Sequence, residues 1–287
     1  MANVKFFDPR IYQILTLSTL LAFGWQARAF EIDPLHFGAI VAACCATQWL
    51  GAKLMASPAD FRSPLITALS LTLLLRADVA WPLILAATIA VGSKFMLRLN
   101  GKHLFNPANI GIVAVVLLTD AAWTTPGQWG TAVWFAALLA GVGLFVTYRA
   151  ARFDVPLIFL SAYATLLFAR ALWLGDPLTI PMLRLENGSL VLFAFFMISD
   201  PKTTPDGAIA RMAFAGLAAA LAYVLTFHFF IADGLFFALA AACLTRPLLE
   251  VFDPAPRYRW GDPVGAQRWM RRLSNNFGAR PPAAPAE

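Results

Sequence analysis

Long apolar stretches, separated by short polar loops, run through most of the chain. A helix that crosses a bilayer needs about 20 apolar residues, because each residue advances about 1.5 Å through a hydrocarbon core of about 30 Å. The pattern predicts an all-α integral membrane protein with about ten transmembrane helices. The predicted spans are 11–30, 36–56, 63–77, 80–98, 105–119, 129–148, 154–174, 188–199, 208–230 and 232–250, of which the third, fifth and eighth are short.

The chain after the last span is polar, Pro-rich and basic. We therefore expect two parts, a polytopic transmembrane domain at 1–250 and a cytoplasmic tail at 251–287. No cleavable signal peptide is expected, because no small-residue cleavage site followed by a soluble chain comes after the first apolar stretch. Composition agrees, since 60% of residues are hydrophobic and 13% charged, against roughly 45–50% and about 25% in soluble domains.

The basic residues predict the orientation. Lys and Arg are enriched on the cytoplasmic side of membrane proteins. With the N-terminus inside, 18 of the 22 fall on the inner side, and only Arg28, Arg76, Arg170 and Arg184 fall outside. We therefore expect a multi-pass protein of the bacterial inner membrane with both termini in the cytoplasm. Attraction to anionic lipid explains the basic tail, so the lipid bilayer is the expected partner and nucleic acid is not.

Ten spans divide into two sets of five, at about 11–119 and 129–250. An odd number of spans per set gives the two sets opposite orientations, as in transporters built from inverted repeats. The short spans 63–77 and 188–199 take corresponding places in the two sets. The sequence therefore predicts two five-helix inverted repeats.

Two polar segments on the inner side are candidates for chemistry, GKHLFNPAN at 101–109 and ISDPKTTPDG at 198–207. Asn106 followed by Pro107 suits a helix start, and Thr204 or Asp206 can cap the next helix. One interpretation is helix punctuation alone. The other is a polar pocket in which helix N-termini, Lys102 and Lys202 favour an anionic or polar ligand.

The segment GKHLFNPANIGIVAV, followed about 90 residues later by FFMISDPKTTPD, resembles the RnfD/NqrB family of membrane subunits of ion-translocating electron-transport complexes. WTTPGQWG at 123–130 resembles a feature of short relatives called UnbU, found beside enediyne biosynthesis genes. The resemblance implies a ten-helix fold of inverted repeats similar to urea transporters. It also implies other membrane subunits as partners.

The family also implies flavin. Its full-length members carry FMN on a Thr of an S/T-G-A-T motif in the outer loop after the FNPA helix. Here that loop, 119–130, is far shorter and lacks the motif, so covalent FMN on Thr124 or Thr125 is not expected. The favoured interpretation of this loop is a Pro-Gly turn anchored by interfacial Trp123 and Trp129.

By resemblance, a non-covalent flavin (riboflavin or FMN) or a quinone would lie near the cytoplasmic face. An isoalloxazine ring needs apolar or aromatic faces and a few hydrogen-bond donors at its edge. The candidate cofactor-binding residues are Lys102, His103, Phe105, Asn106, Asn109, Asp200, Lys202, Thr203, Thr204 and Asp206.

Metal chemistry is not expected. Cys44, Cys45 and Cys243 lie in apolar runs without C-x-x-C spacing, so they predict small buried residues. A bis-His haem between His36 and His228, both near the outer face, is conceivable but not expected, since interfacial histidines are commoner.

Three functions stay open at this stage. The first is a membrane subunit of an electron-transport complex. The second is a transporter or channel for a small polar solute, which the urea-transporter-like architecture favours, and the third is a cofactor-free scaffold or assembly subunit. No catalytic residue is recognisable, and no GxGxxG fingerprint is present, so any enzymatic role would be that of a subunit that does not bind NAD.

Overall fold

The computed structural model describes residues 8–27, 30 and 32–260. The first half of this part holds α1 (Pro9–Ala27), α2 (Pro34–Leu54), α3 (Arg62–Leu74), β1 (Leu75–Arg76), α4 (Ala80–Met96), β2 (Arg98–Leu99), β3 (Lys102–His103) and α5 (Pro107–Leu118). The loop after α5 holds β4 (Trp123–Thr124) and the 3-10 helix η1 (Pro126–Trp129). The second half holds α6 (Val133–Arg149), α7 (Asp154–Leu174), α8 (Thr179–Leu185), α9 (Gly188–Leu192), the π-helical turn η2 (Phe193–Met197), α10 (Ala208–Phe227) and α11 (Gly234–Phe252).

Every predicted span overlaps one of these helices, and the chain is a multi-pass membrane protein. Among the residues that the structure describes, four helices are long and apolar enough to cross a bilayer, namely α2, α7, α10 and α11. The pair formed by α8 and the α9–η2 segment, bent by 49°, brings this number to five if it is one span. Helices α3, α4, α5 and α6 are apolar but shorter. Ten complete crossings therefore stay a prediction. The short helix α8, which the pattern did not predict, lies in an expected outer loop.

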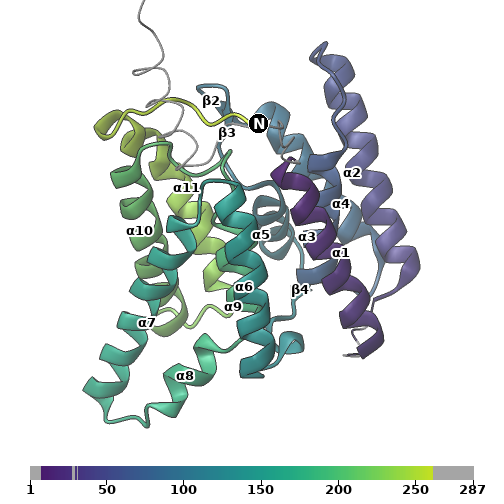
Figure 1. Ribbon diagram of the computed structural model, residues 1–287. Helices are drawn as coiled ribbons and strands as arrows, with labels where there is room; N and C mark the ends of the chain where they lie inside the picture. Colours follow the sequence, from purple (N-terminus) through teal and green to yellow (C-terminus); the bar gives the residue numbers. More distant parts are fainter. Residues whose placement is uncertain (1–7, 28–29, 31, 261–287) are drawn as a thin grey trace, which may run out of the picture.

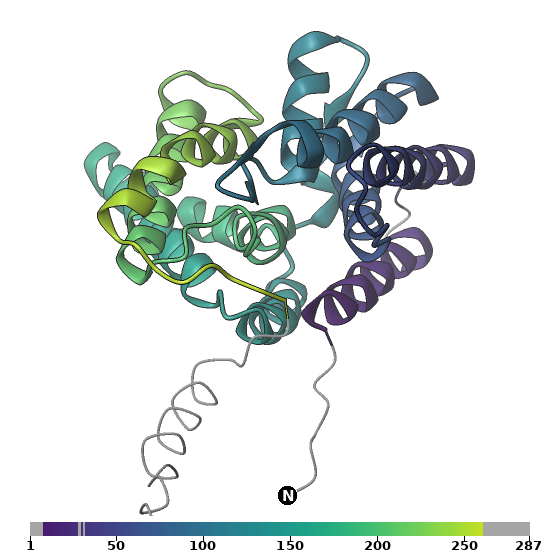
Figure 2. The same cartoon turned by 90° about the horizontal axis from the view of Figure 1, so that it is seen from above.

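The helices form two groups, one from each half of the chain (Figure 1). In the first group α3 packs against α1 and α2, α2 against α4, and α4 against α5. In the second, α6 packs against α9 and η2, α7 against α10, and α10 against α11. The groups meet where α5 contacts α11 and α1 contacts α6, and the view in Figure 2 shows the same division.

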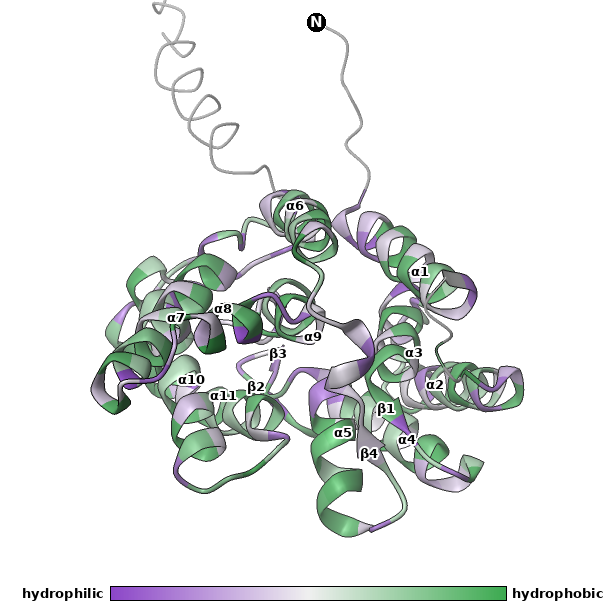
Figure 3. Ribbon diagram, turned by 90° about the horizontal axis from the view of Figure 1, so that it is seen from below, coloured by the Kyte–Doolittle hydropathy of each residue, from purple (hydrophilic) through white to green (hydrophobic). Residues whose placement is uncertain are grey.

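Small residues allow close contact between α4 and α5. A Cβ at Gly111 of α5 would lie 2.6 Å from the carbonyl oxygen of Ala86 and 2.9 Å from the Ala90 side chain, both on α4. Such approach is the usual device for packing helices in a membrane, where the hydrophobic effect does not drive helices together. Figure 3 shows hydrophobic colouring over most of each helix, with hydrophilic colouring mainly in loops and at helix ends.

The two ends of the described chain lie together at one end of the molecule. The Arg10 guanidinium of α1 lies 4.8 Å from the ring centroid of Trp260. The β2–β3 hairpin lies at this same end (Figure 1). Its turn residues Asn100 and Gly101 both have positive φ, 53° and 75°, as a two-residue hairpin turn of type I′ requires. We call this the basic end, and the other the distal end.

Candidate functional site

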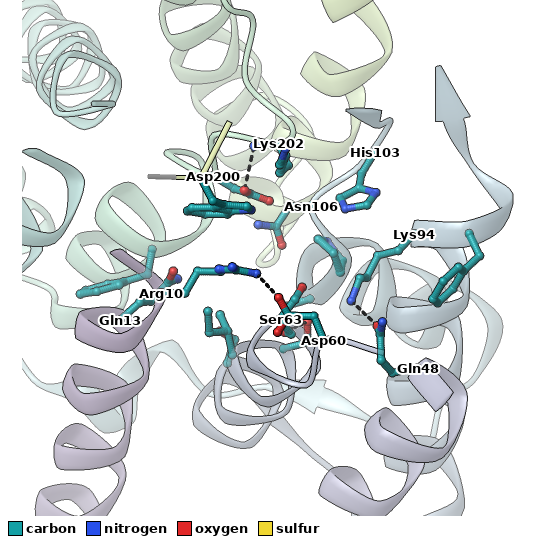
Figure 4. Close-up of a pocket in the computed structure, with 18 of the residues that line it drawn as sticks. Arg10, Gln13, Gln48, Asp60, Ser63, Lys94, His103, Asn106, Asp200 and Lys202 are labelled. Atoms are coloured by element: carbon teal, nitrogen blue, oxygen red, sulfur yellow. Dashed lines mark hydrogen bonds and ion pairs between the residues drawn. The ribbon is translucent and has the colours of Figure 1, made fainter. Parts of the chain in front are cut away.

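The cavity at the basic end has a volume of about 290 Å³, close to the lower limit of about 300 Å³ for ligand pockets. It lies between the two groups of helices, and Figure 4 shows the side chains that point into it. Its polar lining consists of Arg10, Gln13, Gln48, Ser57, Asp60, Ser63, Thr67, Ser70, Lys94, Arg98, His103, Asn106, Asp200 and Lys202. Its apolar and aromatic lining consists of Ile66, Phe95, Pro107, Ala108, Phe196 and Trp260. We call it the basic-end cavity.

Asn106 forms one edge of this cavity and starts α5. Its side-chain oxygen accepts a hydrogen bond from the Asn109 backbone N–H at 3.1 Å, as predicted for an N-cap followed by Pro107. Its amide nitrogen donates to the Met197 carbonyl oxygen at 3.1 Å. That carbonyl belongs to the π-helical turn η2, so Asn106 joins the two halves of the chain at the cavity.

Lys94 and Gln48 form the wall contributed by α4 and α2. The Lys94 ammonium donates to the Gln48 side-chain oxygen at 2.7 Å, and the Lys94 residue is only 5% exposed. Within the described part of the chain, no carboxylate oxygen lies within 4.0 Å of this ammonium. A buried positive charge thus faces the cavity with only a neutral partner.

His103 lies beside Lys94 and is neutral. Burial, and then the positive charges of Lys94 and Arg98, lower the pKa of His103 to about 3. Its Nδ1 atom is buried and has no hydrogen-bond partner among the described residues. The neutral ring therefore offers a polar atom but no charge.

Asp60 is the better compensated of the two carboxylates in the cavity. It accepts from Arg10 at 2.7 Å and from Arg62 at 2.9 Å. The hydrogen bond from the Arg62 side chain, aided by Arg10, holds the pKa of Asp60 well below its usual range. Asp60 therefore stays ionised, and its negative charge is neutralised by Arg10 and Arg62.

Asp200 is the second carboxylate, and it lies in the loop between η2 and α10. Burial raises the pKa of this carboxyl group. Its Oδ1 accepts a hydrogen bond from the Lys202 backbone N–H at 3.0 Å, and burial lowers the pKa of the Lys202 ammonium. The cavity lining carries two acidic groups, Asp60 and Asp200, and four basic groups, namely Arg10, Lys94, Arg98 and Lys202. The cavity thus has a formal charge of +2.

A second cluster of charges lies outside the cavity and is structural. Asp206 is 2.8 Å from Arg152 and 3.0 Å from Lys102, with all three side chains at most 6% exposed. Lys102 also donates to Glu250 at 3.1 Å and to the Thr204 carbonyl oxygen at 2.6 Å. We call these residues the Asp206 cluster. They fasten the β2–β3 hairpin to the second half of the chain.

The predicted binding residues therefore divide into two sets. His103, Asn106, Asp200 and Lys202 line the cavity. Lys102, Thr204 and Asp206 are engaged in the Asp206 cluster, where the Thr204 hydroxyl accepts from Arg152 at 3.0 Å. The remaining three, Phe105, Asn109 and Thr203, are not in its lining. Asn109 instead donates to the Phe236 carbonyl oxygen at 3.0 Å, and Thr203 is fully buried with its hydroxyl 3.2 Å from the Asp200 carbonyl oxygen.

Sequence reasoning missed Lys94, Arg10 and Asp60 as site residues. In the sequence, Lys94 is one inner-side cation among 18, and Gln48 is a polar residue inside an apolar span. The signal available was a lysine close to the end of a predicted span. Its partner is 46 positions away, so the pairing depends on the packing of α2 against α4.

The distal end has a cavity of about 720 Å³, which we call the distal cavity. It contains Thr125, whose hydroxyl is buried without a hydrogen-bond partner among the described residues. Thr124 instead donates to the Asp233 carboxylate. His36 lines this cavity and lies 3.8 Å from Asp33, whereas His228 is the C-cap of α10 and is not part of the lining.

The prediction of an interfacial Trp129 is wrong. Trp129 has 0% exposure and packs edge-on against Phe30, with ring centroids 5.0 Å apart. The turn Pro126–Trp129 folds inward because it follows β4, which pairs with β1 at the end of α3. Trp123 is 43% exposed, as the prediction requires. Among the described residues, no group of three or more His, Cys, Asp or Glu side chains could hold a metal ion.

The basic-end cavity has the lining that a flavin ring requires. Phe95, Phe196 and Trp260 supply aromatic surface. Lys94 supplies hydrogen-bond donors beyond the one used by Gln48, since an ammonium has three. The residues therefore fit the non-covalent flavin that the resemblance implies.

Comparison with known proteins gives a family match and several relatives. Residues 116–257 match the model of the NQR2, RnfD, RnfE family. The RnfD protein of Citrobacter koseri, a subunit of an ion-translocating oxidoreductase complex, is 32% identical over 136 residues, covering 47% of this chain and 37% of that protein. The RnfD protein of Escherichia coli (strain K12 / DH10B) is 33% identical over 138 residues, covering 47% and 36%.

The matched part thus spans little more than a third of these relatives. The segment 198–207, which supplies Asp200 and Lys202, lies inside the family match, and Asn106 lies before it.

Proposed function

Since the chain belongs to the NQR2, RnfD, RnfE family, we propose that it is a membrane subunit of an electron-transport complex and binds a flavin non-covalently in the basic-end cavity. The observation that carries the proposal is the family match over 116–257, whose loop at 198–207 supplies Asp200 and Lys202 to the cavity. The relatives are named as subunits of ion-translocating oxidoreductase complexes, which supports other membrane subunits as partners.

A bound flavin would supply one- and two-electron transfer, and the residues of this chain would position it. Phe196 and Trp260 offer aromatic surface for the ring faces, and Lys94 and the neutral His103 offer polar atoms for the ring edge. The Asn106–Met197 hydrogen bond holds the two halves of the chain together at this point. Both the cap and this bond use the Asn106 side chain, so its role is to position the cavity wall.

Non-covalent binding is favoured over attachment to the outer loop. The loop lacks the S/T-G-A-T sequence, and the Thr124 hydroxyl is hydrogen-bonded to Asp233. The Thr125 hydroxyl lies at the distal cavity and has no partner within the described ranges, so Thr125 is the residue to examine by mass spectrometry. A flavin adduct on a peptide containing Thr125 would contradict this part of the proposal.

The proposal includes the orientation and the repeats. The basic end would face the cytoplasm of a bacterium, because most of the Lys and Arg residues are predicted to lie on that side. Matching helix contacts in the two halves, α2 with α4 and α7 with α10, support two inverted repeats of five spans.

The test is a visible spectrum of the protein purified in mild detergent, before and after acid denaturation. We expect flavin absorbance that stays with the soluble fraction after acid precipitation, as a non-covalent flavin does. Replacing Trp260, a cavity residue, with Ala should lower the flavin content. Replacing Trp173, which is 88% exposed on α7, should leave it unchanged. Absence of flavin from protein prepared with its partner subunits would overturn the proposal.

A second candidate is a channel for a small polar solute. It is favoured by the two cavities at opposite ends of α3, with Ser70 lining the basic-end cavity and Thr72 the distal one. Solute uptake into proteoliposomes that saturates, and that is abolished by Ser70→Leu, would support this function.

A further inference from the structure

We propose that Lys94 and Gln48 form a subsite for an oxygen acceptor with full or partial negative charge, such as an oxyanion or the carbonyl edge of a planar ring. Where the acceptor belongs to a flavin, the inference rests on the proposed function. The subsite itself is derived from this chain alone.

The first argument is the cost of the buried charge. An ammonium removed from water is expensive unless it is paired, and ionisable groups inside membrane proteins usually mark functional sites. Lys94 is 5% exposed, and its only side-chain partner among the described residues is the neutral Gln48. Two of its three N–H donors therefore have no acceptor in the described part of the chain, and Figure 4 shows the side chain in the cavity wall.

The second argument is that neither carboxylate of the lining forms an ion pair with Lys94. Asp60 is held by Arg10 and Arg62, and Asp200 accepts the backbone N–H of its own loop. With four basic side chains against two carboxylates, the lining favours a ligand that carries negative charge.

The third argument is the orientation of α5. Its N-terminus reaches the cavity at Pro107 and Ala108. Proline has no N–H, Asn106 accepts the N–H of Asn109, and no described residue accepts the Ala108 N–H. The positive end of this helix dipole acts in the same direction as the Lys94 ammonium.

Gln48 permits a sharp test, because Gln48→Glu places a carboxylate where the Lys94 ammonium already donates. This variant keeps the size of the side chain and supplies an internal counter-charge. It should fold at least as well as the natural protein while its affinity for the external acceptor falls. Lys94→Gln removes the charge itself. Lys53→Gln removes an exposed lysine at the same end of α2 and serves as the control.

The experiment uses two probes on the full chain in detergent. Riboflavin binding is followed by fluorescence, and nitrate binding by the rise in unfolding temperature at constant ionic strength. We expect Lys94→Gln and Gln48→Glu to weaken binding about ten- to a hundredfold, the worth of one hydrogen bond to a charged group. Lys53→Gln should bind as the natural protein does.

The outcomes separate this inference from the proposed function. Riboflavin binding that is equal in the natural protein and in both cavity variants overturns the subsite and leaves the flavin proposal standing. If the natural protein does not bind riboflavin, the result contradicts the flavin proposal, and the nitrate measurements alone test the subsite. Saturable stabilisation by nitrate that is lost in both variants supports the subsite, and its absence from the natural protein overturns it. If Lys94→Gln does not fold, the binding measured with Gln48→Glu tests the subsite.

Discussion

Replacing Asp206 with Asn should destabilise the protein strongly, because the change removes one charge from a buried cluster. The Asp206 side chain is 6% exposed, with Arg152 at 2.8 Å and Lys102 at 3.0 Å. Breaking a buried ion pair from one side costs about 3–5 kcal/mol. Lys102 would keep Glu250, whereas Arg152 would lose its only carboxylate partner among the described residues. We therefore expect the lower figure, about 3 kcal/mol.

Thermal unfolding in detergent measures this effect. One kcal/mol shifts the Tm of a chain of this size by about 2–4 °C, so we expect Asp206→Asn to lower the Tm by about 6 °C or more. The matched control is Asp176→Asn. Asp176 pairs with Arg170 at 3.4 Å, and both side chains are about one-third exposed, so this pair should contribute less than about 1 kcal/mol. Equal shifts for the two variants would refute the claim that burial gives the Asp206 cluster its strength.

Three further predictions concern single side chains. Gly111→Ala should lower the Tm or the yield of folded protein, because its Cβ would meet the α4 backbone, whereas Gly216→Ala should be neutral since nothing lies within 4 Å of its Cβ position. Asn106→Ala should cost about 2 kcal/mol in thermal unfolding, through loss of the cap and of the bond to Met197; an unchanged Tm and flavin content would remove its positioning role.

The pH dependence of stability should report His103. Its ring is neutral in the folded protein, while the unfolded chain takes up a proton below about pH 6.5. Stability should therefore fall as the pH drops from about 7 to 5, by up to about 2 kcal/mol. His103→Gln should flatten the Tm–pH curve over this range, and an equally steep curve would contradict the assignment.

The positions of the helices could be predicted from hydropathy because lipid imposes length and composition on each of them. The Asn106 cap was predictable for a similar reason, since capping is a local property of Asn followed by Pro. The environments of Lys102 and His103 could not be predicted in this way. They are neighbours on β3, and successive strand residues point to opposite sides. Lys102 therefore enters the Asp206 cluster, and His103 lines the cavity.

That hairpin depends on the Asn100-Gly101 turn, a short-range signal that the search for spans passes over. Lys94 shows a different limit. Its environment comes from α2, α4 and the loop at 198–207 at once. These three segments are far apart in the sequence, so no short stretch of the chain contains them all. The prediction for Trp129 is wrong for the same reason. The burial of Trp129 depends on Phe30 and Phe135, which come from the segments before and after it in the chain.

The shortness of α3 has an electrical consequence. Its 13 residues extend only about 20 Å, against a hydrocarbon thickness of about 30 Å, and a polar cavity adjoins each end. Water entering these cavities would carry the bulk potential inward from both faces. Most of the membrane potential would then drop across the short layer of protein around α3 that separates the two cavities. An ion or proton moving between the cavities would cross most of the field, worth about 2.3 kcal/mol per charge at 100 mV.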